Sequence, residues 1–84
     1  MDIAEQVKAL LEERFPGAAV DIEIITYSQK VSGHLIWGGF DGVEQIDRQD
    51  WVIGWLRQRL GPKAASVSTI LTYSTNEYQV MSLV

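Results

Sequence analysis

The sequence predicts an α+β fold, an α-β-β-α-β core whose helices pack on one face of a small sheet. Apolar residues recur at helical spacing in two segments and alternate with polar residues in three others. No repeat, linker or low-complexity segment divides the 84 residues, so we expect one domain spanning 1–84. The helices are expected near 2–15 and 47–60, and the strands near 19–27, 31–37 and 67–73.

The first helix is predicted by its ends and its apolar face. Asp2 and Glu5 have the spacing of a capping box, in which the two residues satisfy each other's backbone N–H groups. Pro16 and Gly17 end the segment. Its apolar positions, which should face the core, are Ile3, Val7, Leu10, Leu11 and Phe15.

The next two segments predict an antiparallel hairpin. Residues 20–24 alternate with period two, and the pattern continues to Tyr27. The link at 28–30 is too short for a parallel crossover, so residues 31–37 should return antiparallel. Gly38 and Gly39 close this second strand.

The second helix is expected to begin after Asp47 as its N-cap and to end at Gly61 and Pro62. Its apolar stripe comprises Trp51, Val52, Trp55, Leu56 and Leu60.

The segment after the third strand is compatible with two structures. Residues 74–77 can cap a short helix that carries Tyr78 and Met81, or they can form a hairpin turn into a further strand. We favour the short C-terminal helix.

Composition excludes several functions. The absence of cysteine fits a reducing compartment, the first residues lack a secretion signal, and no apolar run reaches the roughly 20 residues of a membrane span. We therefore expect a cytoplasmic protein. No nucleophile, base and orienting group occur in a recognisable pattern, so we expect neither an enzyme nor a cofactor.

His34 is the only histidine of the chain and therefore the only candidate imidazole ligand for a metal ion. A protein metal site normally needs three or four converging ligands, which one imidazole and no cysteine do not supply. Either His34 is structural, or it completes a site that a partner protein shares. The acidic residues Asp41, Glu44, Asp47 and Asp50 lack the spacing of a calcium loop, so capping and solvation explain them better.

A nucleic-acid interface is the third hypothesis, behind a protein-binding surface and a shared metal site. Residues 39–42 have the Gly-x-x-Gly pattern of a KH loop, but a strand precedes them and acidic side chains accompany them. The formal net charge of −4 also opposes phosphate binding. The cations available to such an interface are Arg48, Arg57, Arg59 and Lys63.

A protein-binding surface is the leading hypothesis. Tryptophan and arginine are enriched in binding hot spots, and here they lie beside a glycine-rich turn. In so small a chain two of the three tryptophans should belong to the core, leaving one at the surface. The residues expected to bind a partner are Trp37, Phe40, Arg48, Trp51 and Trp55.

The chain resembles the BolA family of small α+β proteins with a KH-like topology. The resemblance rests on three motifs: 40–42 matches a Phe-x-Gly after the second strand, 48–49 a polar helix start, and 73–78 a turn ending the last strand. It implies the fold, and it implies a monothiol glutaredoxin as partner, with a shared iron–sulfur cluster. The family's cluster histidine at the head of the last strand falls at Ser66, and the first loop, 28–33, has no Cys or His. The resemblance therefore favours a relative that has lost the cluster.

Overall fold

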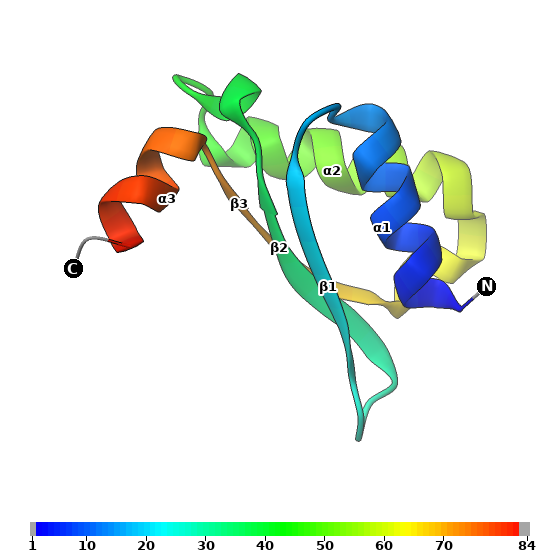
Figure 1. The fold of residues 1–84 in the computed structure, drawn as a ribbon. Coiled ribbons are helices and arrows are strands. Elements are labelled where there is room, and N and C mark those ends of the chain that lie inside the picture. The colour runs from blue at the N-terminus through cyan, green and yellow to red at the C-terminus, as the bar shows by residue number, and fades with distance from the viewer. Residues whose placement is uncertain (1, 83–84) are drawn as a thin grey trace.

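The computed structural model describes residues 2–82 and contains three α-helices, three strands and two short 3₁₀ segments within that range (Figure 1). In chain order the elements are α1 (Ile3–Arg14), β1 (Ala19–Ile25), β2 (Lys30–Ile36), η1 (Gly38–Phe40), α2 (Gln45–Leu60), η2 (Gly61–Ser66), β3 (Val67–Tyr73) and α3 (Thr75–Ser82). This is the predicted α+β order, with the short C-terminal helix.

The three strands form one mixed sheet in the order β1-β2-β3. β1 and β2 are antiparallel, as expected of their short link, whereas β2 and β3 run parallel because α2 and η2 carry the chain back between them. The register changes between Val31 and Gly33 on the β3 side of β2. A side chain at Gly33 would also collide with the β1 backbone at Asp21 and Ile22, so β1 and β2 approach closely there.

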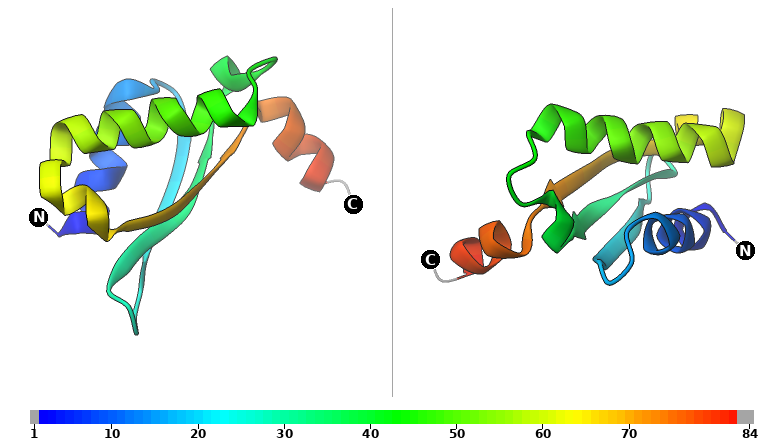
Figure 2. Two further views of the ribbon diagram at one scale, coloured as in Figure 1. Left: turned by 180° about the vertical axis from the view of Figure 1, so that it is seen from behind. Right: turned by 90° about the horizontal axis from the view of Figure 1, so that it is seen from above.

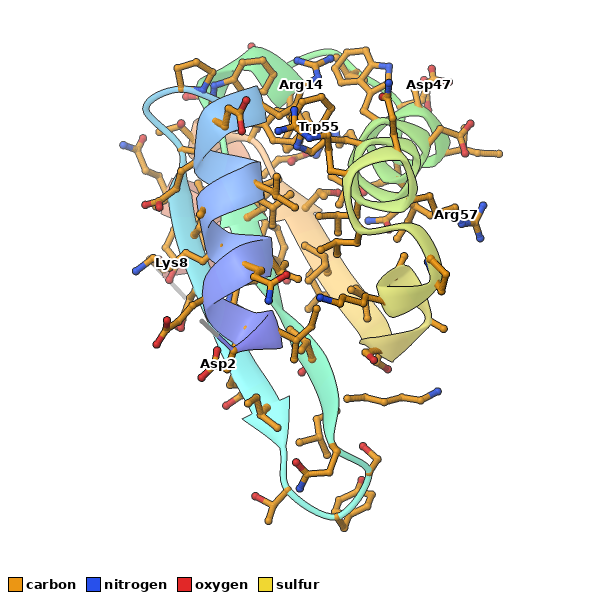
Figure 3. All side chains as sticks on the ribbon, turned by 90° about the vertical axis from the view of Figure 1, so that its right-hand side faces the viewer. Asp2, Lys8, Arg14, Asp47, Trp55 and Arg57 are labelled. Atoms are coloured by element: carbon orange, nitrogen blue, oxygen red, sulfur yellow. The ribbon has the colours of Figure 1, made fainter. Side chains whose placement is uncertain are left out.

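Helices α1 and α2 lie side by side on one face of the sheet (Figure 3). The core lies between them and the strands, and it is formed by residues that are almost fully buried: Val7, Leu11, Phe15, Val31, Leu35, Phe40, Val52, Leu56 and Ile70. The predicted apolar faces of both helices supply five of these side chains, and the strands and the turn at Phe40 supply the others.

Helix α3 is placed differently from α1 and α2. It follows the end of β3 and lies towards the opposite face of the sheet, as the front view and the view from above both show (Figures 1 and 2). On that face the ring of Tyr78 stacks on His34 at 6.2 Å between centroids. The face is otherwise open, because no other described helix covers it.

The observed helices and strands differ from the predicted ones only at their ends. One of these differences corrects a predicted helix cap. Asp2 caps α1 by accepting from the Glu5 N–H at 2.8 Å, as predicted. Asp47, however, is not the N-cap of α2: the helix begins two residues earlier, at Gln45, with Glu44 at the N-cap. Asp47 therefore lies in the first turn, where its charge still suits the positive end of the helix dipole.

Candidate functional site

Two of the five residues expected to bind a partner lie in the interior. Phe40 is fully buried, and Arg48 has an exposed fraction of only 3%. The expectation that Arg48 stands free at a surface turn was wrong, because its guanidinium faces Glu77 and the ring of Phe40 instead of solvent. A partner cannot reach either residue without rearranging the turn.

The three tryptophans divide between packing and exposure. The indole N–H of Trp37 donates to the Pro16 carbonyl at 3.0 Å, and that of Trp55 donates to the Leu10 carbonyl at 2.9 Å. Both rings are half-buried and join α1 or its following turn to the rest of the molecule. Trp51 is exposed by 38%, which makes it the member of the predicted surface that a partner can contact.

The basic residues proposed for nucleic acid do not form a common free surface. Arg48 is buried, and Arg59 lies 3.5 Å from Glu13 and stacks over Trp55 at 4.8 Å. Two of the four cations are therefore engaged within the protein. The geometry weakens the nucleic-acid alternative.

A bidentate ion pair joins α2 to α3. Arg48 donates from Nη1 to Oε1 of Glu77 at 2.6 Å and from Nη2 to Oε2 at 3.2 Å, while its Nε donates to the Val43 carbonyl at 2.7 Å. Glu77 also belongs to a capping box with Ser74. The Ser74 N–H donates to Oε1 of Glu77 at 2.7 Å, and the Glu77 N–H donates to Oγ of Ser74 at 3.1 Å.

This pair sets the charge state of Glu77. Hydrogen bonds from Arg48, and then from the Ser74 backbone, lower the pKa of Glu77 from its ordinary value of 4.5 to about 2. The carboxylate therefore stays charged in acidic solution in which an ordinary glutamate becomes protonated. The bridge and the capping box together fix the start of α3, which has no buried residue of its own.

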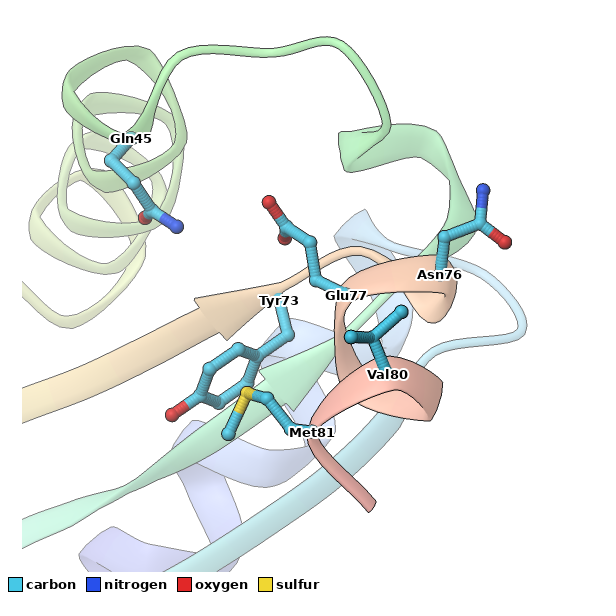
Figure 4. A pocket seen from close by; sticks show the side chains of 6 residues that line it. All are labelled: Gln45, Tyr73, Asn76, Glu77, Val80 and Met81. Atoms are coloured by element: carbon cyan, nitrogen blue, oxygen red, sulfur yellow. The ribbon is translucent and has the colours of Figure 1, made fainter. Parts of the chain in front are cut away.

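A groove of about 540 Å³ opens between α3 and the start of α2 (Figure 4). Val80 and Met81, exposed by 63% and 51%, come from α3 and line one side, and Tyr73 lies at the base where β3 ends. Gln45, Asn76 and Glu77 supply the polar atoms of its rim. An apolar groove with a few polar groups is the usual form of a binding site.

The sequence reasoning missed this groove. Val80 and Met81 follow Glu77 at helical spacing, i+3 and i+4, which is the available signal. That signal has meaning only if residues 75–82 are a helix, and the sequence left the alternative of a strand open.

His34 lies on the open face of the sheet, half-buried, with Nε2 3.9 Å from Oδ2 of Asp21. Within residues 2–82, no group of three or more His, Cys, Asp or Glu side chains is placed to hold a metal ion. A metal role of His34 therefore needs ligands from elsewhere and stays a prediction. The acidic residues 41–50 likewise form no such group.

None of the described helices combines the length and apolar composition needed to cross a membrane. No protein-family model and no curated protein matches the sequence.

The arrangement of the described elements defines an α+β domain: a three-stranded mixed sheet with two helices on one face and a short helix beside the other. Among solved structures it is similar to BolA1 from Arabidopsis thaliana, with a TM-score of 0.68 over 88% of this chain and 90% of that one. The two sequences are 18% identical. The chain thus has a BolA-like fold with a divergent sequence.

Proposed function

We propose that the chain is a non-catalytic, cytoplasmic domain that acts by binding another protein through the groove beside α3. The observation that carries the proposal is the exposure of Val80 and Met81 beside Tyr73, on a helix held in place by Arg48 and Glu77. Exposed apolar surface next to a concave site is characteristic of protein interfaces, and methionine adapts to varied apolar partners. The pair of buried Arg48 and partly exposed Glu77 keeps the groove formed before a partner arrives.

The partner expected from this chemistry inserts apolar side chains between α3 and Tyr73. The rim amide of Asn76 is available to hydrogen-bond the backbone of such a segment, whereas both ends of the Gln45 amide are already bonded to Thr72. An amphipathic helix presents apolar side chains in this way.

The proposal is tested by capturing partners from the native extract with the wild type and with Met81→Glu. Tyr27→Glu is the matched control, because it adds the same charge at an exposed residue of the hairpin tip, away from the groove. We expect partners that the wild type and Tyr27→Glu retain and Met81→Glu loses, while circular dichroism shows all three folded. Partners that survive Met81→Glu would contradict the groove as the site.

Trp51→Ala tests the surface that the sequence predicts, around the turn before α2. If Trp51→Ala abolishes capture and Met81→Glu does not, the interface lies at the turn before α2. We expect the reverse, since Trp37, Phe40, Arg48 and Trp55 are committed to internal contacts and Trp51 would act without them.

A second candidate follows from the partly exposed imidazole of His34 on the open face. The BolA-like fold makes a shared iron–sulfur cluster with a monothiol glutaredoxin the specific version of this role, although Ser66 lacks the expected ligand chemistry. The two proteins are mixed with iron and sulfide, and the visible spectrum is compared for wild type and His34→Ala. We expect no His34-dependent change; such a change would establish the cluster role.

A further inference from the structure

The two edges of the sheet are protected to different degrees. At the β3 edge, side-chain amides from α2 bind the strand's backbone. Gln45 Nε2 donates to the Thr72 carbonyl at 3.1 Å, and Gln49 Nε2 donates to the Ile70 carbonyl at 2.9 Å. These acceptors are no longer available to another strand.

The β1 edge has no equivalent protection. In the described residues no strand pairs with the outer side of β1, which is the other terminal strand of the sheet. Helix α1 contacts β1 over its face, and Figure 3 shows the helix in front of the strand, with the strand's outer edge beside it. An open strand edge of seven residues is a template for a further strand.

The apolar row of β1 is also incompletely covered. Val20, Ile22 and Ile24 face the helices, because they are in register with Leu35, Gly33 and Val31. Val20 and Ile22 stay half-buried and Ile24 is exposed by 38%, whereas Val31 and Leu35 of the neighbouring strand are fully buried. A strand added outside β1 would extend the sheet beneath α1 and cover this row.

The charges on the opposite face of β1 determine which kind of strand the edge attracts. Asp21 and Glu23 are both exposed there, and the His34 imidazole lies 3.9 Å from Asp21. A second copy pairing antiparallel about Ile22 would place Asp21 opposite Glu23, and like charges directly opposite are destabilising. A strand with lysine or arginine at those positions would be attracted. Lys8 of α1 projects towards the same edge, but from the helix layer (Figure 3).

We infer that the free edge of β1 binds an extended basic segment of a partner protein as a fourth strand. The segment alternates apolar residues towards α1 with lysine or arginine towards Asp21 and Glu23. This surface is separate from the groove beside α3, so either one can fail without the other.

The probe is a fluorescein-labelled seven-residue peptide of alternating lysine and valine, titrated with the full chain at physiological salt and followed by fluorescence anisotropy. We expect saturable binding that weakens at least tenfold in Asp21→Lys/Glu23→Lys. The same variant should gain affinity for a peptide of alternating glutamate and valine. Asp41→Lys/Asp50→Lys is the control, since it makes the same charge change at exposed residues outside the sheet. Equal weakening in the control would reduce the effect to net charge and overturn the inference.

Backbone methylation separates strand pairing from simple charge attraction. Methylating the lysine nitrogens removes the donors along one edge of the peptide, and methylating the valine nitrogens removes those along the other. Pairing with β1 predicts that one methylated peptide binds like the parent and the other at least tenfold more weakly. Equal affinities of the two methylated peptides would contradict the inference. A homodimer that Asp21→Lys/Glu23→Lys alters would assign the edge to a second copy and contradict it as well.

Discussion

The guanidinium of Arg48 and the carboxylate of Glu77 form a two-pronged ion pair between the first turn of α2 and the first turn of α3, 29 residues apart in the chain. Arg48 is buried against Phe40, while Glu77 remains partly exposed. Because α3 buries no residue, this pair is the main polar contact that fixes the helix against α2. It connects the core directly to the groove proposed as the binding site.

Arg48→Ala should therefore lower stability and also loosen α3. It removes the Arg48 donors from the Val43 carbonyl and from Glu77, which keeps only the hydrogen bond from the Ser74 N–H among those described above. We expect the melting temperature to fall by at least the roughly 4–8 °C that 1 kcal/mol represents in a domain of this size. Hydrogen exchange at residues 75–82 should accelerate more than exchange at α1. The matched control is Arg57→Ala, an exposed arginine of the same helix, which should leave both readouts nearly unchanged. Equal melting temperatures of the two variants would contradict a structural role for the pair.

The acid dependence of the pair follows from the lowered pKa of Glu77. The folded pKa of about 2 lies below the ordinary value of 4.5, so Glu77 stabilises the folded state fully above pH 4.5. That contribution is lost as the pH falls from about 4.5 towards 2. The carboxyl carbon of Glu77 can be titrated by NMR in wild type and in Arg48→Met. We expect the variant's pKa to rise towards the ordinary value, and an unchanged low pKa would show that Arg48 is not the main cause.

Gly33 and Gly54 should respond to alanine in opposite directions. At Gly33 a Cβ would contact the Asp21 carbonyl and lie 2.9 Å from Cα of Ile22, so the hairpin backbone must shift. Gly33→Ala should cost about 1–3 kcal/mol of unfolding free energy. Gly54 is inside α2 with open space around it, and Gly54→Ala should stabilise by about 0.5–1 kcal/mol. Urea unfolding measures both, and a Gly33→Ala protein as stable as the wild type would contradict the close approach of β1 and β2.

The sequence predicted the frame of the fold because the frame depends on local patterns. The helix periodicity of α1 and α2, the short link at 28–30 and the stop signals at Pro16 and Pro62 each act within a few residues. Local patterns do not predict the burial of Thr72 or the exposure of Leu71. Thr72 is buried and Leu71 exposed, the reverse of their polarity.

The burial of Thr72 depends on a contact with a residue that is distant in the sequence. Thr72 Oγ1 donates to Oε1 of Gln45 at 2.7 Å, so a polar side chain is satisfied in the interior. Arg48 was misplaced for the same reason, because its partner Glu77 is distant in sequence. The groove beside α3 depends on where that helix docks, and its position depends on two long-range contacts, the Arg48–Glu77 pair and the Tyr78–His34 stack.

Gln49 gives a direct test of the protected β3 edge. Gln49→Glu preserves the size of the side chain but replaces the N–H donor with a carboxylate facing the Ile70 carbonyl at neutral pH. We expect a loss of about 1–3 kcal/mol, the cost of leaving a buried polar group unpaired. Below about pH 4 the introduced carboxyl is protonated and donates again, so the difference from wild type should shrink.

The control is Gln58→Glu, which makes the same chemical change at an exposed position of α2 and should stay within about 0.5 kcal/mol of wild type. Analytical ultracentrifugation adds a second readout. An unprotected β3 edge should favour pairing between copies, so Gln49→Glu should self-associate at concentrations where Gln58→Glu is monomeric. If Gln49→Glu matches Gln58→Glu in both stability and mass, the amide does not protect the edge. The asymmetry between β3 and β1, on which strand addition at β1 depends, would then be lost.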